Sequence, residues 1–305
     1  MGPPPAIAPA RPHELEAAFR LIFRHLADGE RETRVANALH LIRQGELDPA
    51  GILAANVGGE LTGAIVCLPV PGASGLIWPP QALDGPQRLA VEDALVSRAT
   101  AWLREGGAGL GQCLLTEAEM PLVGPLLRNG FAHVTALWYM QHDLTTASVM
   151  PPRGRLRHVP YSQLSNPAPF HQTLLRTYEG TQDCPEITGV RSIEQIIAGH
   201  RAQGKHNPGR WLLALAAGRP VGVLLLCEMP EWAAWDVAYV GIVPEERGHG
   251  YGREIMHQAL AVARADGVAR LTLSVDARNE PAWRLYTDLG FQPHDRREVV
   301  LAIWR

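Results

Sequence analysis

Residues 237–253 read VAYVGIVPEERGHGYGR, and this stretch decides the fold. An apolar run of strand type leads through a proline and a glycine-rich turn directly into a helical pattern. Glycine at positions 248, 250 and 252 removes three Cβ atoms, so successive backbone N–H groups can converge on an anion at the positive end of the helix. Arg247 and Arg253 add positive charge on either side. The stretch therefore predicts a phosphate-binding turn.

Spacing excludes two common phosphate motifs. A Walker loop needs GxxxxGK[ST], and no Lys-Ser or Lys-Thr follows these glycines. A dinucleotide fingerprint needs GxGxxG, whereas Gly250 is followed by Gly252 with only one residue between them.

The sequence around this turn alternates between helical and strand patterns. Helices are expected at 170–179, 193–201, 251–265 and 281–289. A hairpin is expected at 212–226, and strands at 235–243, 271–275 and 298–304. We therefore expect an α/β (α+β) fold, with a mixed central sheet flanked by helices.

The chain contains an internal repeat with a constant offset. Residues 51–67 align without a gap with 211–227, and residues 121–131 (PLVGPLLRNGF) align with 281–291 (PAWRLYTDLGF). Two separate segments with one offset indicate a tandem duplication. The predicted domains are 6–144 and 155–305, joined by a linker at 145–154 that contains Pro151 and Pro152.

Composition excludes several classes of protein. The 305 residues include 28 basic and 31 acidic side chains, without a run of five like charges, so no nucleic-acid partner is expected. No apolar stretch is long enough for a membrane span, and the N-terminus has no secretory pattern. Four cysteines without CxxC spacing predict buried thiols in a cytoplasmic protein. Histidine spacing predicts no metal site.

The glycine turn resembles the acyl-CoA loop of the GNAT superfamily of N-acetyltransferases, whose pattern is Q/R-x-x-G-x-G/A. Arg247, Gly250 and Gly252 match this pattern, and the superfamily's second signature resembles Asn279-x-Pro281 through Gly290-Phe291. The resemblance covers residues 235–291 and implies a tandem member whose co-substrate is acetyl-CoA. It also implies which residues contact acetyl-CoA: Val240, Ile242, Val243, Arg247, Gly248, His249, Gly250, Tyr251, Gly252, Arg253 and Asn279.

The same resemblance implies two catalytic residues. Tyr286 matches the tyrosine that protonates the departing CoA thiolate, and Asp236 stands where tandem members carry a glutamate general base. An amine must lose a proton before it can attack a thioester, so direct attack in a ternary complex needs such a base. Aspartate is one methylene shorter than glutamate, so a bridging water, Glu228 or Glu231 could share the task.

The first domain lacks these groups. At the offset of the repeat, Leu126 stands opposite Tyr286, Leu76 opposite Asp236, Glu119 opposite Asn279, and no glycine stands opposite the turn. We expect an inactive GNAT-like domain at 6–144 and a catalytic one at 155–305.

The acceptor is expected to be a small-molecule or protein amine, lined by residues 176–210, where Asp183 and Glu186 could hold its charge. Cys184 has no histidine partner at a recognisable spacing, so covalent catalysis is disfavoured. The alternative function is a non-catalytic CoA-binding sensor or interaction module. The sequence gives no oligomeric state and no acyl chain length.

Overall fold

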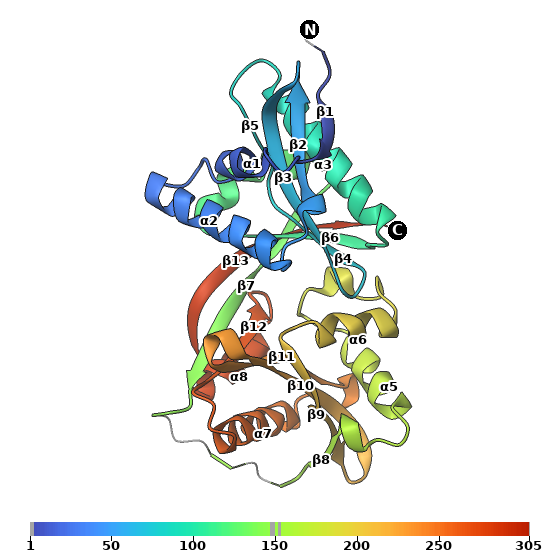
Figure 1. The fold of residues 1–305 in the computed structure, drawn as a ribbon. Helices are drawn as coiled ribbons and strands as arrows, with labels where there is room; N and C mark the ends of the chain where they lie inside the picture. The colour runs from blue at the N-terminus through green and yellow to red at the C-terminus, as the bar shows by residue number, and fades with distance from the viewer. Residues whose placement is uncertain (1–2, 147–149, 152–153, 305) are drawn as a thin grey trace. The chain divides into compact units, whose positions relative to one another are not determined.

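The structure is a computed structural model that describes residues 3–146, 150–151 and 154–304. The chain forms two compact units, Met1–Val134 with Glu298–Arg305, and Thr135–Arg297. Each unit contains a mixed sheet with helices on both faces (Figure 1). The predicted fold class, one mixed α/β domain used twice, is confirmed. None of the described helices is long and apolar enough to cross a membrane.

The sheet of the second unit has the strand order β7-β12-β11-β10-β9-β8. Its neighbouring strands are antiparallel except for β11 and β12, which are parallel. The strands are β7 (Ala132–Asp143), β8 (Arg157–Pro160), β9 (Lys205–Ala216), β10 (Arg219–Met229), β11 (Ala234–Ile242) and β12 (Arg270–Asp276).

Two pairs of helices cover this sheet. Helices α5 (Ala168–Thr177) and α6 (Ile193–Arg201) pack on one face, around the fully buried Phe170 and Trp211. Helices α7 (Tyr251–Ala265) and α8 (Glu280–Asp288) pack on the other face. Apolar residues recur along α7 at helical spacing, so its buried stripe excludes water from the sheet beneath.

The first unit repeats this plan with the order β1-β2-β3-β4-β6-β13. Its strands are β1 (Ala6–Pro9), β2 (Ile52–Val57), β3 (Glu60–Val70), β4 (Ser74–Ile77), β6 (Leu110–Leu115) and β13 (Gln292–Ile303), and β5 (Gln81–Ala82) pairs with β3. Helices α1 (Leu15–Ile22) and α2 (Asp28–Gln44) cover one face, and α3 (Arg88–Glu105) and α4 (Gly124–Arg128) cover the other.

Strand register reproduces the sequence repeat. In the first unit Ser74 pairs with Leu110, and in the second Ala234 pairs with Arg270, so both partners are displaced by the offset of the repeat. Strands β7 and β13 have equal lengths, and their first residues, Ala132 and Gln292, are separated by the same offset. The duplication therefore extends to individual residue pairs.

Each sheet ends with a strand from the other half of the sequence. In the second unit Val275 of β12 pairs with Trp138 of β7, and in the first unit Leu115 of β6 pairs with Glu298 of β13. The compact units therefore differ from the predicted bounds of 6–144 and 155–305, because the final strands are exchanged. The predicted linker, 145–154, includes residues 147–149 and 152–153, which lie outside the described residues.

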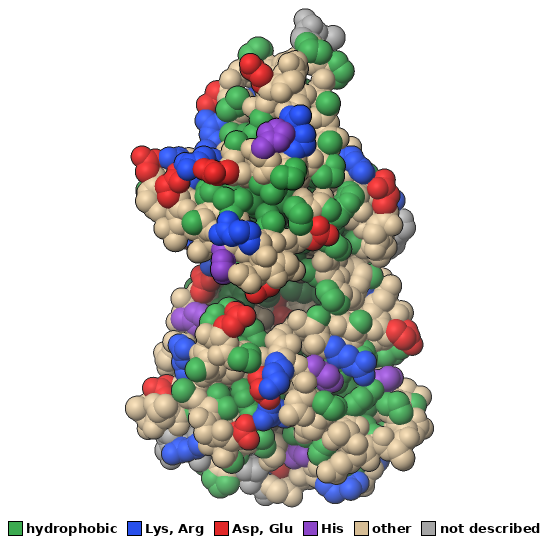
Figure 2. Space-filling view, in the orientation of Figure 1, with side chains coloured by type: hydrophobic (Ala, Val, Ile, Leu, Met, Phe, Trp, Pro, Cys, Tyr) green, Lys and Arg blue, Asp and Glu red, His purple; other side chains and the backbone are tan. Residues whose placement is uncertain are grey.

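Charged side chains on the face drawn in Figure 2 are interspersed, with neither sign gathered into a continuous patch. This face therefore shows no basic patch of the kind that binds nucleic acids and other polyanions.

Candidate active site

A groove opens in the second unit where β11 and β12 diverge. Their pairing stops at Asp236 and Thr272; among the described strands, β11 continues to pair with β10 beyond this point, and β12 with β7. The groove between the diverging ends has a volume of about 390 Å³. Its walls include Val240, Gly241 and Ile242 of β11 and Ser274 and Val275 of β12. The free edge of a strand is thus open to a ligand.

Close packing explains the glycine in this wall. A Cβ at Gly241 would lie 2.6 Å from Cβ of Thr177, the last residue of α5. Glycine therefore lets α5 approach β11 along the groove.

The glycine turn follows β11 and begins α7. Gly248 and Gly250 have φ values of +78° and +79°, which favour glycine, and Gly250 is the N-cap of α7. Among the described hydrogen bonds, none uses the backbone N–H groups of residues 248–253. N–H groups without a partner among the described hydrogen bonds and the helix dipole are the features that favour anion binding, and phosphate binding at this turn stays a prediction.

Arg247 lines the groove, but its side chain anchors the protein backbone. Its guanidinium donates to the carbonyl oxygens of Ile242, Thr177, Glu179 and Gly180, at 3.1, 3.1, 2.7 and 3.0 Å. These bonds fasten the end of α5 and the following loop to the end of β11. A direct contact with phosphate stays a prediction for this residue.

Glu254 and Arg155, which the sequence analysis did not single out, form hydrogen bonds that support the glycine turn. The buried carboxylate of Glu254 accepts hydrogen bonds from Nε of Arg155 at 2.8 Å and from the N–H of Leu156 at 2.9 Å. Nη1 of Arg155 also donates to the carbonyl oxygen of His249 at 3.1 Å. The sequence does contain one signal for this pair, because an acidic residue in the first turn of a helix that is predicted to bind phosphate requires a neighbouring cation to neutralise its charge.

Tyr286 and Asn279 enter the groove from α8. Tyr286 is 7% exposed, and no described residue forms a hydrogen bond with its hydroxyl. Burial raises the pKa of this phenol, so it stays protonated at neutral pH and can donate a proton. Asn279 is the N-cap of α8 and accepts a hydrogen bond from the N–H of Ala282 at 3.3 Å.

Asp236 stands on β11 at the point where β12 departs, and it is not part of the groove lining. Burial raises its pKa to about 6, against the lowering effect of the Thr272 hydroxyl, which donates to Oδ1 at 2.6 Å. Ser274, two positions beyond Thr272, does line the groove. Glu228 forms ion pairs with Lys205 and Arg210, which makes it a poor substitute base.

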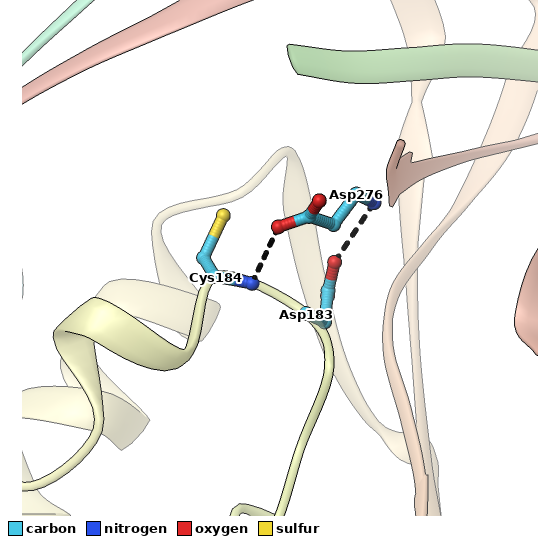
Figure 3. Close-up of side chains that lie close together, drawn as sticks. All are labelled: Asp183, Cys184 and Asp276. Atoms are coloured by element: carbon cyan, nitrogen blue, oxygen red, sulfur yellow. Dashed lines mark hydrogen bonds between the residues drawn. The ribbon is translucent and has the colours of Figure 1, made fainter. Parts of the chain in front are cut away.

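The segment after α5 is tied to the end of β12. The N–H of Asp276 donates to Oδ1 of Asp183 at 2.9 Å, and the N–H of Cys184 donates to Oδ2 of Asp276 at 2.9 Å (Figure 3). Asp276 is fully buried. Burial alone would raise its pKa, but hydrogen bonds from Arg278, Thr135 and backbone N–H groups hold the pKa at about 2.

These three side chains lie close enough for metal ligands. Both oxygens of Asp276 already accept hydrogen bonds, and the Arg278 guanidinium occupies the position of a cation. Burial also raises the pKa of the Cys184 thiol, which disfavours the thiolate that a metal or a covalent mechanism would use. The cluster is therefore interpreted as a hydrogen-bonded anchor for the segment.

The groove gathers only part of the predicted set. Its described lining includes Val240, Ile242, Arg247, Gly248, Asn279 and Tyr286. It does not include Asp236, Val243, His249, Gly250, Tyr251, Gly252 or Arg253. Val243 is buried and its N–H donates to the carbonyl oxygen of Val221, so its observed role is packing. Arg253 forms an ion pair with Asp288.

Comparison with known proteins finds relatives of the segment that forms this groove. Residues 173–291 match the family model described as Acetyltransferase (GNAT) family. Residues 173–291 are therefore similar to a GNAT acetyltransferase domain, and the expected resemblance is confirmed.

One curated relative is the Mycothiol acetyltransferase of Thermobispora bispora, 30% identical over 213 residues; the match covers 63% of this chain and 65% of that protein. Two solved structures share the fold over nearly the whole chain. A GCN5-related N-acetyltransferase from Sphaerobacter thermophilus is 18% identical and has a TM-score of 0.63. The match covers 99% of this chain and 97% of that protein's chain. A tandem GNAT protein from the clavulanic acid biosynthesis pathway is 16% identical, has a TM-score of 0.51 and covers 98% of each chain.

Proposed function

We propose that the second domain binds acetyl-CoA and transfers its acetyl group to an amine by direct attack in a ternary complex. The observation that carries this proposal is the groove between β11 and β12, which joins the unpaired strand edge to the buried hydroxyl of Tyr286. The pyrophosphate would lie on the N–H groups of residues 248–253, and the pantetheine arm along Val240 and Ile242.

Tyr286 is the proposed acid. Loss of an acetyl group leaves a CoA thiolate, and a proton donor beside the sulfur prevents its return. A buried phenol with a raised pKa and no hydrogen-bond partner among the described residues is suited to this task.

Asp236 is the proposed base, acting through water. Its pKa of about 6 leaves it mostly ionised at pH 7 but still able to hold a proton. Its position outside the groove lining supports a bridging water. No metal or resident cofactor takes part in this proposal.

The first domain is proposed to be non-catalytic. The first turn of α3 contains no glycine, and Arg88 is already paired with Asp84 and Glu92. These two carboxylates also bind Arg24 and Arg128, respectively. The side chains are thus engaged with one another, and the turn lacks the glycine residues that would let backbone N–H groups approach a phosphate. Leu126, opposite Tyr286, is fully buried and has no proton to donate.

The acceptor class is proposed to be a small-molecule amine. The printed name of the Thermobispora bispora relative describes a mycothiol acetyltransferase, and the match spans 65% of that protein. This likeness supports a small acceptor.

The test is an amine panel with the full-length chain and acetyl-CoA, in which free thiol is measured together with the mass of the acetylated amine. The proposal predicts amine-dependent thiol release that falls sharply in Tyr286→Phe. Acetyl-CoA binding without turnover on any amine would instead support a CoA sensor.

A further inference from the structure

The groove carries one charge of each sign among its described lining residues. Arg247 is its cation and Asp183 its carboxylate. Arg247 is bonded to the carbonyl oxygen of Ile242 at the end of β11, whereas Asp183 is bonded to the N–H of Asp276 at the end of β12. A ligand in the groove therefore meets opposite charges on its two walls.

Asp183 is the carboxylate of this region that has no ion pair among the described residues. Arg278 forms a two-pronged ion pair with Glu186, at 2.6 and 2.9 Å, and also bonds to Asp276. Glu186, which was expected to share the binding of an amine, is thereby neutralised. Oδ1 of Asp183 accepts the N–H of Asp276, and no described residue donates to its Oδ2.

The position of Asp183 is fixed from two directions. Asp276 bonds to Asp183 through its own N–H and to Cys184 through its carboxylate, so the chain at 183–184 is pinned to the last residue of β12 (Figure 3). Arg278 extends this anchor to Glu186. A carboxylate held in this way loses little conformational freedom when it binds a cation.

Tyr286 independently indicates a ligand at the same place. Its hydroxyl is on a side chain that is more than nine-tenths buried, lines the same groove and has no hydrogen-bond partner among the described residues. The ring is held inside the protein, while the hydroxyl at the groove is available to form a hydrogen bond with a ligand.

We infer that Asp183 binds the ammonium group of the acceptor amine beside Tyr286, and that Asp276 and Arg278 are the residues that position it. This inference rests on the proposed function and names its acceptor class: an aliphatic amine that carries a positive charge at neutral pH. The ammonium group would donate a charged hydrogen bond to Oδ2 of Asp183, the oxygen to which no described residue donates.

The test uses the full-length chain saturated with CoA, which forms a complex that cannot react. It is titrated with 2-aminoethanol, n-butylamine and 1,4-diaminobutane, and with n-butanol as the uncharged counterpart, while the melting temperature is followed. At least one amine should bind, n-butanol should not, and Asp183→Asn should raise the dissociation constant of that amine about tenfold or more. The dissociation constant of CoA itself should change less than twofold.

Glu179→Gln is the matched control. It removes the same charge from a nearby exposed side chain that does not line the groove, and should leave amine affinity unchanged. If Asp183→Asn does not fold, Asp183→Glu retains the charge and should bind the amine more weakly than the native chain.

The inference is contradicted if none of the amines binds to the CoA-loaded native chain. It is also contradicted if the Asp183 variants bind the amine as tightly as the native chain does. Replacing CoA by acetyl-CoA separates this result from the proposed function. Binding without acetyl transfer would contradict the proposed function alone, and transfer with unaltered amine binding in Asp183→Asn would contradict the inference alone.

Discussion

The hydroxyl of Thr272 donates a 2.6 Å hydrogen bond to Oδ1 of Asp236, at the last residue pair that joins β11 to β12. Burial raises the pKa of this carboxyl to about 6, and the hydrogen bond limits the rise because it favours the charged form. The proposed base thus stands at the point where β11 and β12 diverge.

This relationship predicts a pH profile. A general base works only when it is deprotonated, so kcat/KM should fall as the pH is lowered through about 6. Thr272→Val removes the hydrogen bond, raises the pKa of Asp236 further and should move the acidic limb to higher pH. Thr272→Ser should restore the native profile. An acidic limb that is the same in all three proteins would exclude Asp236 as the base.

Tyr286→Phe should lower kcat on the best amine by about 10²-fold or more, because the thiolate then leaves without a proton. The dissociation constant of acetyl-CoA, measured by calorimetry, should change little, since phenylalanine keeps the ring that packs against Phe291. Native turnover in this variant would remove the acid role.

Gly250→Ala should weaken acetyl-CoA binding by about tenfold or more, because φ is +79° and an added Cβ would lie 3.3 Å from Nη2 of Arg155. Gly267→Ala is the matched control. Gly267 has φ of +76° with no atom within 4 Å of an added Cβ, and it follows the other end of α7. Both variants carry backbone strain, but only Gly250→Ala should alter affinity; equal affinities would argue against a phosphate site at this turn.

The strand exchange predicts crossed effects of two equivalent core substitutions. Val300 of β13 is fully buried in the first unit, and Met140 of β7 is fully buried in the second. Val300→Ala should speed amide exchange in β6, and Met140→Ala should speed it in β12. We expect losses of about 1–3 and about 2–5 kcal/mol in the free energy of unfolding, respectively. The reverse pattern, followed by hydrogen exchange and mass spectrometry, would mean that each half keeps its own final strand.

The sequence predicted most of the elements because their local signals agree. The helix expected at 251–265 is α7 with the same bounds, and the helix expected at 193–201 is α6, where Ser192 and Gln195 form a capping box. The register of the parallel strands has the same offset as the sequence repeat.

The exchange of β7 and β13 could not be predicted. The two strands are copies with the same length and spacing, so either could complete either sheet, and only the packing of the whole chain selects between them. Arg155 was missed for a related reason. It is far from Glu254 along the chain, and no periodic pattern connects residues so distant in sequence.

The central claim is that acetyl-CoA binds at one place, in the groove of the second domain. Hydrogen exchange of the full-length chain with and without acetyl-CoA tests it most directly. The account predicts protection at residues 240–253 and 279–286, and none at 84–93, the corresponding turn of the first domain. Protection at 84–93, or no protection at 240–253 with saturating acetyl-CoA, would contradict it.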